Sequence, residues 1–98
     1  MEITKQAEGE KLTLALNGRL DTMTSPELEA VLKESLDGVK ELVFECTDLE
    51  YLSSAGLRVL LGAQKAMSEA GKMTICHVNE PVMEVFEVTG FTNVFTIE

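Results

Sequence analysis

Apolar and polar residues alternate near the start of the chain. Three leucines occupy every second position of the segment Lys11–Asn17, which is the period of a strand with one buried face. A shorter strand is expected around Ile3, and the polar stretch Ala7–Glu10 between the two contains a glycine suited to a turn. The sequence therefore predicts an antiparallel hairpin at the N-terminal end.

A helical period replaces the alternation after Thr24. Thr24 or Ser25 can cap the helix, and Pro26 suits its first turn. Glu27 stands three residues after Thr24, as in a capping box. Asp37–Gly38 is expected to end the helix, because glycine accepts the left-handed conformation after a helix. The apolar residues recur at the spacing of one buried stripe and comprise Leu28, Val31, Leu32 and Leu36.

The middle of the chain predicts an interior strand, a loop and a long helix. Glu41–Cys46 contains a consecutive apolar run typical of an interior strand, and Thr47–Leu52 is expected to be a loop. The helix after Ser53–Leu57 runs to about Ala70 and ends at Gly71. It has an apolar stripe (Leu57, Leu60, Leu61 and Met67), a second surface of mostly small side chains (Val59, Ala63, Ala66 and Ala70) and a narrow solvent face (Arg58, Lys65 and Glu69).

The remainder of the chain predicts two strands and one helix. Lys72–Val78 has the pattern of a strand, Asn79 can cap the last helix, Gly90 ends it, and Val94–Ile97 is expected to close the sheet. Strands and helices that alternate in this order form parallel crossovers. The expected fold class is α/β, with a mixed four- to five-stranded sheet, an antiparallel N-terminal hairpin, parallel βαβ crossovers and three to four helices, in one domain spanning residues 1–98.

Three segments are expected to meet at one edge of this sheet. In open α/β sheets, binding sites gather beyond the carboxyl ends of the parallel strands. This rule brings together Gly18–Asp21, Tyr51–Ser54 and Val78–Glu80. The prediction of a functional site depends on this convergence.

Charge narrows the choice of partner. The chain has 8 Lys and Arg against 17 Asp and Glu, a net charge of −9, so it lacks the cationic surface that nucleic acids or anionic membranes require. A basic or mixed-charge protein partner suits it better. We expect a cytoplasmic location, because the N-terminal segment lacks the pattern of a signal peptide and no apolar stretch could span a membrane. Cys46 and Cys76 lie in apolar segments, as buried thiols do.

Ser53 and Ser54 stand where the long helix begins. Serine is a favoured N-cap, which is the simplest interpretation of either residue. The same position suits a switch, because a phosphate on Ser54 would face free backbone N–H groups and the positive end of the helix dipole. A partner docked over this edge would face about −1.5 to −2 added charges. Phosphorylation is therefore expected to end binding while the domain stays folded.

Two motifs resemble those of STAS domains, in particular bacterial anti-sigma factor antagonists. Tyr51–Leu61 is similar to the family's pattern of an apolar residue followed by Asp-Ser-Ser/Thr-Gly-Leu, which opens a long helix. Gly18–Asp21 is similar to the family's Gly-x-Leu/Ile-Asp element, and the resemblance covers essentially the whole chain. Ser53 stands where the family often has Asp, and Ala55 where it often has Ser or Thr.

The resemblance implies a partner and a switch. The partner would be an anti-sigma factor that is also a serine kinase, so that binding it frees a sigma factor. The kinase would phosphorylate Ser54, and a metal-dependent serine phosphatase would restore the antagonist. The residues expected to contact the partner are Asp21, Thr22, Ser53, Ser54, Gly56, Arg58 and Asn79. An alternative is a STAS interaction module of another signalling or trafficking complex, without serine phosphorylation.

Catalysis and metal binding have less support. Ser54 would need His77 as base and Asp21 to orient it, but the Gly-x-Ser-x-Gly elbow is absent and His77, inside an apolar strand, is expected to pack in the core. Cys46, Cys76 and His77 lack the spacing of a metal site, because adjacent strand residues point to opposite faces. No enzyme activity, cofactor or metal is therefore predicted.

Overall fold

A computed structural model describes all residues, 1–98. The elements in chain order are β1 (Glu2–Glu8), β2 (Lys11–Leu20), α1 (Ser25–Ser35), β3 (Glu41–Leu52), α2 (Ser54–Ala70), β4 (Lys72–Cys76), α3 (Glu80–Thr89), a 3₁₀ turn (Phe91–Asn93) and β5 (Thr96–Ile97). The five strands form one sheet in the order β1-β2-β3-β4-β5; β1 is antiparallel to β2, and the other pairs are parallel. The predicted mixed α/β fold is confirmed.

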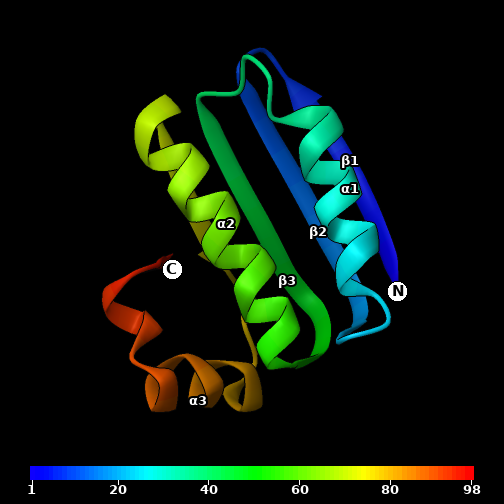
Figure 1. The fold of residues 1–98 in the computed structure, drawn as a ribbon, viewed down its shortest axis with the longest axis vertical. Helices are drawn as coiled ribbons and strands as arrows, with labels where there is room; N and C mark the ends of the chain where they lie inside the picture. Colours follow the sequence, from blue (N-terminus) through cyan, green and yellow to red (C-terminus); the bar gives the residue numbers. More distant parts are fainter.

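The helices lie in two places relative to the sheet. Figure 1 shows α1 and α2 side by side across one face, with α3 at the end where β3 finishes and α2 begins. The strands turn their alternating apolar residues toward α1 and α2. This core includes Leu12, Leu14 and Leu16 of β2, Leu42, Phe44 and Cys46 of β3, and Leu28, Leu32, Leu57, Leu60 and Met67 of the two helices.

The small-residue surface of α2 faces α1. Val59 and Ala63 line a groove between the helices together with Leu32 and Leu36 of α1. Ala63 is buried, whereas Ala66 is exposed at the rim of the groove. This surface therefore belongs partly to the helix packing. None of the three α-helices has the length and apolar content needed to cross a bilayer.

Two strand boundaries differ from the sequence prediction. The predicted loop Thr47–Leu52 is the second half of β3, paired with the end of β2. Register shifts in this pairing allow Leu49 and Leu52, three residues apart, both to be buried, so the period of two is lost. In the other direction, β4 ends at Cys76 instead of Val78, because His77 adopts a left-handed backbone with φ 62°.

The ends of the first helix also differ from the prediction. Its N-cap residue, Thr24, makes no capping hydrogen bond; the Thr24 hydroxyl instead donates to the Arg19 carbonyl and accepts from the Asp21 N–H. The helix ends at Ser35, before the predicted Asp37–Gly38 stop, although Gly38 does have a positive φ of 82°. The expected closing strand, Val94–Ile97, is shortened to Thr96–Ile97 by the preceding 3₁₀ turn.

Candidate functional site

The ends of β2 and β3 bring the two predicted motifs together. Leu20 and Leu52 are Cα partners in the parallel pairing, and the Ser53 N–H donates to the Leu20 carbonyl at 2.9 Å. Asp21 is the residue after Leu20, and Ser53 is the residue after Leu52. The two motif segments therefore lie next to each other at the carboxyl edge, as the edge rule predicts.

The serines occupy the first positions of α2. Ser53 is the N-cap, and its hydroxyl oxygen accepts a hydrogen bond from the Gly56 N–H at 3.4 Å. Ser54 is the first helical residue, and it is exposed. No acidic residue lies in the first turn of α2. A negative group on Ser54 would therefore meet the unpaired N–H groups of a helix start that carries no acidic side chain of its own.

Gly56 sets how closely α2 approaches the strands. The residue is buried, and a Cβ at this position would lie 2.7 Å from Leu52 Cδ1 and 2.8 Å from Leu20 Cγ. Any side chain here would force the Leu20 and Leu52 side chains, or the helix start, to move. Although the sequence analysis expects Gly56 to contact a partner, the structure gives it a packing contact beneath the site.

The loop after β2 is held by the Asp21 carboxylate. Its Oδ1 accepts hydrogen bonds from the N–H groups of Met23, at 3.0 Å, and Thr24, at 3.1 Å. The bond from the Thr24 backbone, followed by those from Met23 and the Thr24 hydroxyl and by the charge of Arg19, outweighs partial desolvation and lowers the pKa of Asp21. This carboxylate is therefore ionised at neutral pH and fixed beside the serines.

Three exposed residues outside the set expected to contact a partner extend this surface. The Arg19 guanidinium lies over the Tyr51 ring, 4.2 Å from its centroid, and Arg19 Nε lies 3.7 Å from Asp21 Oδ2. Met23 is 84% exposed on the neighbouring loop. Alternation along β2 and β3 cannot identify these residues, because outward-facing strand positions near an edge look the same as ordinary solvated ones. The sequence analysis brings the segments of Arg19 and Tyr51 to the same edge, but the contact between the two side chains is visible only once the strands are paired.

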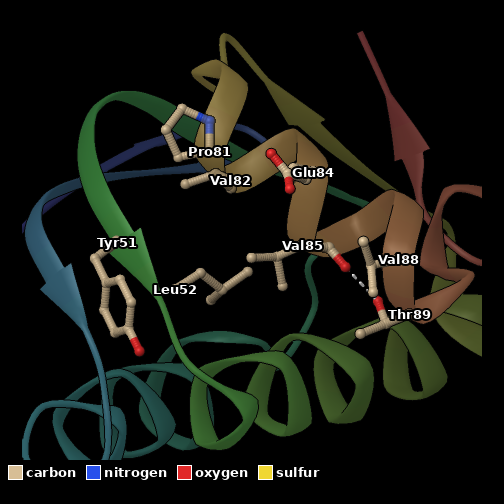
Figure 2. Close-up of a pocket in the computed structure, with 8 residues that line it drawn as sticks. All are labelled: Tyr51, Leu52, Pro81, Val82, Glu84, Val85, Val88 and Thr89. Carbon is tan, nitrogen blue, oxygen red and sulfur yellow. Dashed lines mark hydrogen bonds between the residues drawn. The ribbon is translucent and has the colours of Figure 1, made fainter.

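A groove of apolar side chains lies between the end of β3 and α3. Figure 2 shows its lining of Tyr51, Leu52, Pro81, Val82, Glu84, Val85, Val88 and Thr89. Asn79 fixes α3 against β3: its side-chain oxygen accepts from the Val82 N–H at 2.9 Å, and its Nδ2 donates to the Leu49 carbonyl at 3.0 Å. The predicted cap is present, and Asn79 is exposed beside this groove.

The remaining predicted contact residues line a hollow on the other side of the α2 start. Thr22 and Arg58 are both exposed there and line the hollow together with Ala55 and Glu29. Of the seven residues expected to contact a partner, Asp21, Thr22, Ser53, Ser54 and Arg58 therefore gather around the loop after β2 and the start of α2. Asn79 lies at the start of α3, and Gly56 lies underneath.

The arrangement considered for catalysis does not form. His77 is not packed in the core, as expected from its sequence position; its side chain is 66% exposed and its Nδ1 lies 2.8 Å from a Glu45 oxygen. From Glu45, β3 continues for about 20 Å at strand rise before it reaches Leu52 and Ser54. His77 is therefore at a different part of the sheet from Ser54 and cannot act as its base.

Solved structures with the same arrangement define the class of fold. A crystal structure of an anti-sigma factor antagonist from Mycobacterium paratuberculosis superposes with a TM-score of 0.88, covering 98% of this chain and 83% of that one at 18% identity. The Bacillus protein SpoIIAA, solved in its phosphorylated form, gives a TM-score of 0.77, covering 99% and 91% at 17% identity. At these identities the likeness establishes the fold alone.

Sequence comparison establishes the family. The family model described as STAS domain matches residues 2–98. BtrV of Bordetella bronchiseptica, assigned as an anti-sigma factor antagonist, is 33% identical over 99 residues, covering 99% of this chain and 85% of BtrV. The anti-sigma-B factor antagonist of Staphylococcus aureus is 31% identical, covering 84% and 78%. The chain belongs to the STAS domain family, with anti-sigma factor antagonists among its relatives.

Proposed function

We propose that this protein is an anti-sigma factor antagonist whose binding is switched off by phosphorylation of Ser54. It binds an anti-sigma factor that is also a serine kinase, in the cytoplasm, and so frees a sigma factor for transcription. The kinase transfers the phosphoryl group to the Ser54 hydroxyl, and a serine phosphatase of the metal-dependent type removes it. The domain itself has no catalytic role.

The observation that carries this proposal is the exposed Ser54 at the first position of α2, beside the ordered Asp21 loop. An exposed hydroxyl is open to a kinase, and the helix start favours the phosphate that results. A partner covering the same edge would have to desolvate that phosphate next to the ionised Asp21 carboxylate, which opposes docking. One modification would then leave the fold intact and weaken the complex.

The relatives support the general role. Those from Staphylococcus aureus and Paenibacillus polymyxa are named as anti-sigma-B and anti-sigma F factor antagonists, the latter at 29% identity over 89 residues. SpoIIAA has been solved in both unphosphorylated and phosphorylated forms. The names of these relatives support the role of antagonist. The identity of the kinase, of the acceptor serine and of the phosphatase is part of our proposal for this chain.

Mass spectrometry tests the modification. The purified chain is incubated with ATP and an anti-sigma factor kinase of its own organism; we expect one phosphate, lost in Ser54→Ala and retained in Ser53→Ala. Ser53→Ala is the matched control, because it removes the neighbouring hydroxyl and leaves Ser54. A phosphate on Ser53, or on neither serine, contradicts the proposed acceptor. Treatment of the modified chain with a metal-dependent serine phosphatase is expected to restore the original mass.

Pull-down of the anti-sigma factor tests the switch. Wild type and Ser54→Ala are expected to retain the partner, and Ser54→Asp to lose it, with at least about a tenfold weaker affinity. Equal retention by all three would remove phosphorylation from the account.

The second candidate is a STAS module that binds a partner without phosphorylation. The departures from the usual motif favour it, because Ser53 and Ala55 replace an acidic and a hydroxyl residue next to the acceptor. This candidate predicts no phosphate on the chain and equal partner binding by wild type, Ser54→Ala and Ser54→Asp.

A further inference from the structure

A group of potential metal ligands lies on the face of the sheet opposite α1 and α2. Leu42, Phe44 and Cys46 of β3 point into the core, so Glu45 between them points to the other face. Glu45 and Cys76 are Cα partners in the pairing of β3 with β4. Cys76 Sγ lies 3.5 Å from Glu45 Oε2.

His77 is the third potential ligand, and an unusual backbone conformation brings it to Glu45 and Cys76. A strand would turn His77 to the face opposite Cys76, but His77 has φ 62°, which is uncommon for a residue with a Cβ. The change of direction brings His77 Nδ1 to 2.9 Å and 2.8 Å from the two Glu45 oxygens. One sulfur, one imidazole nitrogen and one carboxylate oxygen then lie within 4.8 Å of one another.

We propose that Glu45, Cys76 and His77 form a binding site for a zinc-type divalent cation. Thiolate, imidazole and carboxylate are the ligands that zinc takes in proteins, and three protein ligands leave a fourth tetrahedral position for water or another donor. The site is distinct from the Ser54 edge and goes beyond the proposed function. The sequence analysis considered Cys46, Cys76 and His77 and assumed that His77 continues the strand; the left-handed backbone at His77 removes that assumption for Cys76 and His77.

The two contacts that Glu45 makes are close to those of a tetrahedral site, whereas Cys76 Sγ and His77 Nδ1 lie within 4.8 Å of each other and approach on binding. Bond lengths to zinc place sulfur about 3.5 Å from each of the other ligand atoms, and nitrogen about 3.3 Å from oxygen. The Cys76–Glu45 contact of 3.5 Å fits directly. The His77–Glu45 contact of 2.8 Å has to open by about 0.5 Å. The exposed His77 side chain is free to make that movement, since it is tethered only at Nδ1 to Glu45.

The surroundings fit a bound cation. Thr47 donates from its backbone N–H, at 3.1 Å, and from its hydroxyl to Glu45 Oε1, which orients the carboxylate as partners behind metal ligands do. On binding, the Cys76 thiol releases its proton to solvent, and the proton that Nδ1 donates to Glu45 also leaves, so that the neutral imidazole carries its proton on Nε2. Bonds then form from the metal to Sγ, Nδ1 and a carboxylate oxygen. The thiolate and carboxylate together then balance the two positive charges of the ion.

Cobalt(II) is the probe, because a thiolate bonded to Co²⁺ gives a charge-transfer absorption band in the near ultraviolet. The reduced chain, without a histidine tag, is titrated with Co²⁺ and the metal is then displaced by Zn²⁺. We expect one equivalent of Co²⁺, an absorption band that zinc removes, and a Zn²⁺ dissociation constant below about 10 µM. The Zn²⁺-bound chain is also expected to unfold at a higher temperature than the metal-free chain.

Variants separate this site from adventitious binding. Cys76→Ser is expected to remove the band, and His77→Ala and Glu45→Gln to weaken binding at least about tenfold. Cys46→Ala is the matched control: this thiol is buried on the other face, so the band is expected to remain. Circular dichroism of each metal-free variant establishes that it is folded. No band in wild type, or a band that survives Cys76→Ser, overturns the proposal.

Discussion

Gly56 lies at the contact between the start of α2 and the strands beneath it, where an added methyl group would disturb the packing. The nearest atoms to an added Cβ, at 2.7 to 3.0 Å, are those of the Leu52 and Leu20 side chains, both of which are fully packed in the core. Helix propensity favours alanine over glycine by about 1 kcal/mol, but overpacking a core contact opposes folding by about 1–3 kcal/mol. At this residue packing therefore outweighs propensity.

Gly56→Ala is expected to lower the free energy of unfolding by up to about 2 kcal/mol, measured by urea denaturation. Gly62→Ala is the matched control in the same helix, since nothing lies within 4 Å of its Cβ position. At that position only the higher helix propensity of alanine acts, so the free energy of unfolding is expected to rise by up to about 1 kcal/mol. Changes of the same sign and size at both positions would contradict the packing argument.

The Glu45 carboxylate gives the chain a pH-dependent contribution to stability. Desolvation opposes its ionisation, but hydrogen bonds from the Thr47 side chain, His77, the Thr47 backbone and Cys76 outweigh that effect and lower the pKa to about 2. A carboxyl group with a lowered pKa stabilises the fold above its ordinary pKa of 4.5, and this contribution disappears as pH falls toward 2.

Removal of the Glu45 carboxylate is expected to make the stability of the fold depend less on pH at acidic pH. With a chelator present, the urea midpoint of wild type should fall between pH 5 and pH 2.5 more steeply than that of Glu45→Gln, while Glu45→Gln is the less stable protein at pH 7. Glu2→Gln, on exposed β1, is the control and should follow wild type. Parallel profiles for wild type and Glu45→Gln would show that the Glu45 hydrogen bonds do not favour the ionised form.

At the scale of elements, the caps of α2 and α3 differ in strength. Ser53 accepts from Gly56 at a long 3.4 Å, whereas Asn79 accepts from Val82 at 2.9 Å and also donates to Leu49 in β3. The second cap therefore satisfies a helix N–H and ties the helix to the sheet. The first contributes little beyond the conformation of the turn.

Asn79→Ala is expected to lower the free energy of unfolding by about 2 kcal/mol, as the sum of a lost cap and a lost side chain–backbone hydrogen bond. Ser53→Ala, at the longer cap, should lower it by about 0.5–1 kcal/mol. Chemical denaturation of both variants checks the order. A larger loss at Ser53 would mean that its 3.4 Å contact is the stronger cap.

The elements were predictable where their side-chain period is regular. The leucines of β2, the stripe of α2 and the Asn79 and Gly90 ends of α3 follow from spacing and capping preferences. The second half of β3 does not, because register shifts against β2 change its period and make Thr47–Leu52 resemble a loop. Such shifts depend on the partner strand and leave no mark in the sequence of one strand.

At the scale of the whole molecule, the carboxyl-edge rule located the serine site but not its full extent. It brought Asp21 and Ser54 together because parallel pairing of β2 with β3 depends only on topology. The Arg19–Tyr51 contact and the groove along α3 depend on side-chain directions at strand ends. The cluster at His77 depends on one left-handed residue, which no alternation pattern can reveal.

The proposed switch requires a fold that accepts negative charge at the start of α2. The helix dipole and free N–H groups contribute about 0.3–1 kcal/mol in favour of an anion there. The Asp21 carboxylate, which is ionised at neutral pH, repels the same anion and offsets part of the gain. The net effect on folding should be small, so any loss of partner binding would arise at the interface.

Ser54→Asp is therefore expected to change the free energy of unfolding by less than about 1 kcal/mol at neutral pH and low salt. Ser54→Lys is the matched control, because a cation at the same position opposes the dipole; it should be the less stable of the two, and salt should narrow the difference. Urea denaturation at two ionic strengths measures both. If Ser54→Asp lost more than about 2 kcal/mol, unfolding would itself account for lost partner binding, and the interface would no longer be needed to explain it.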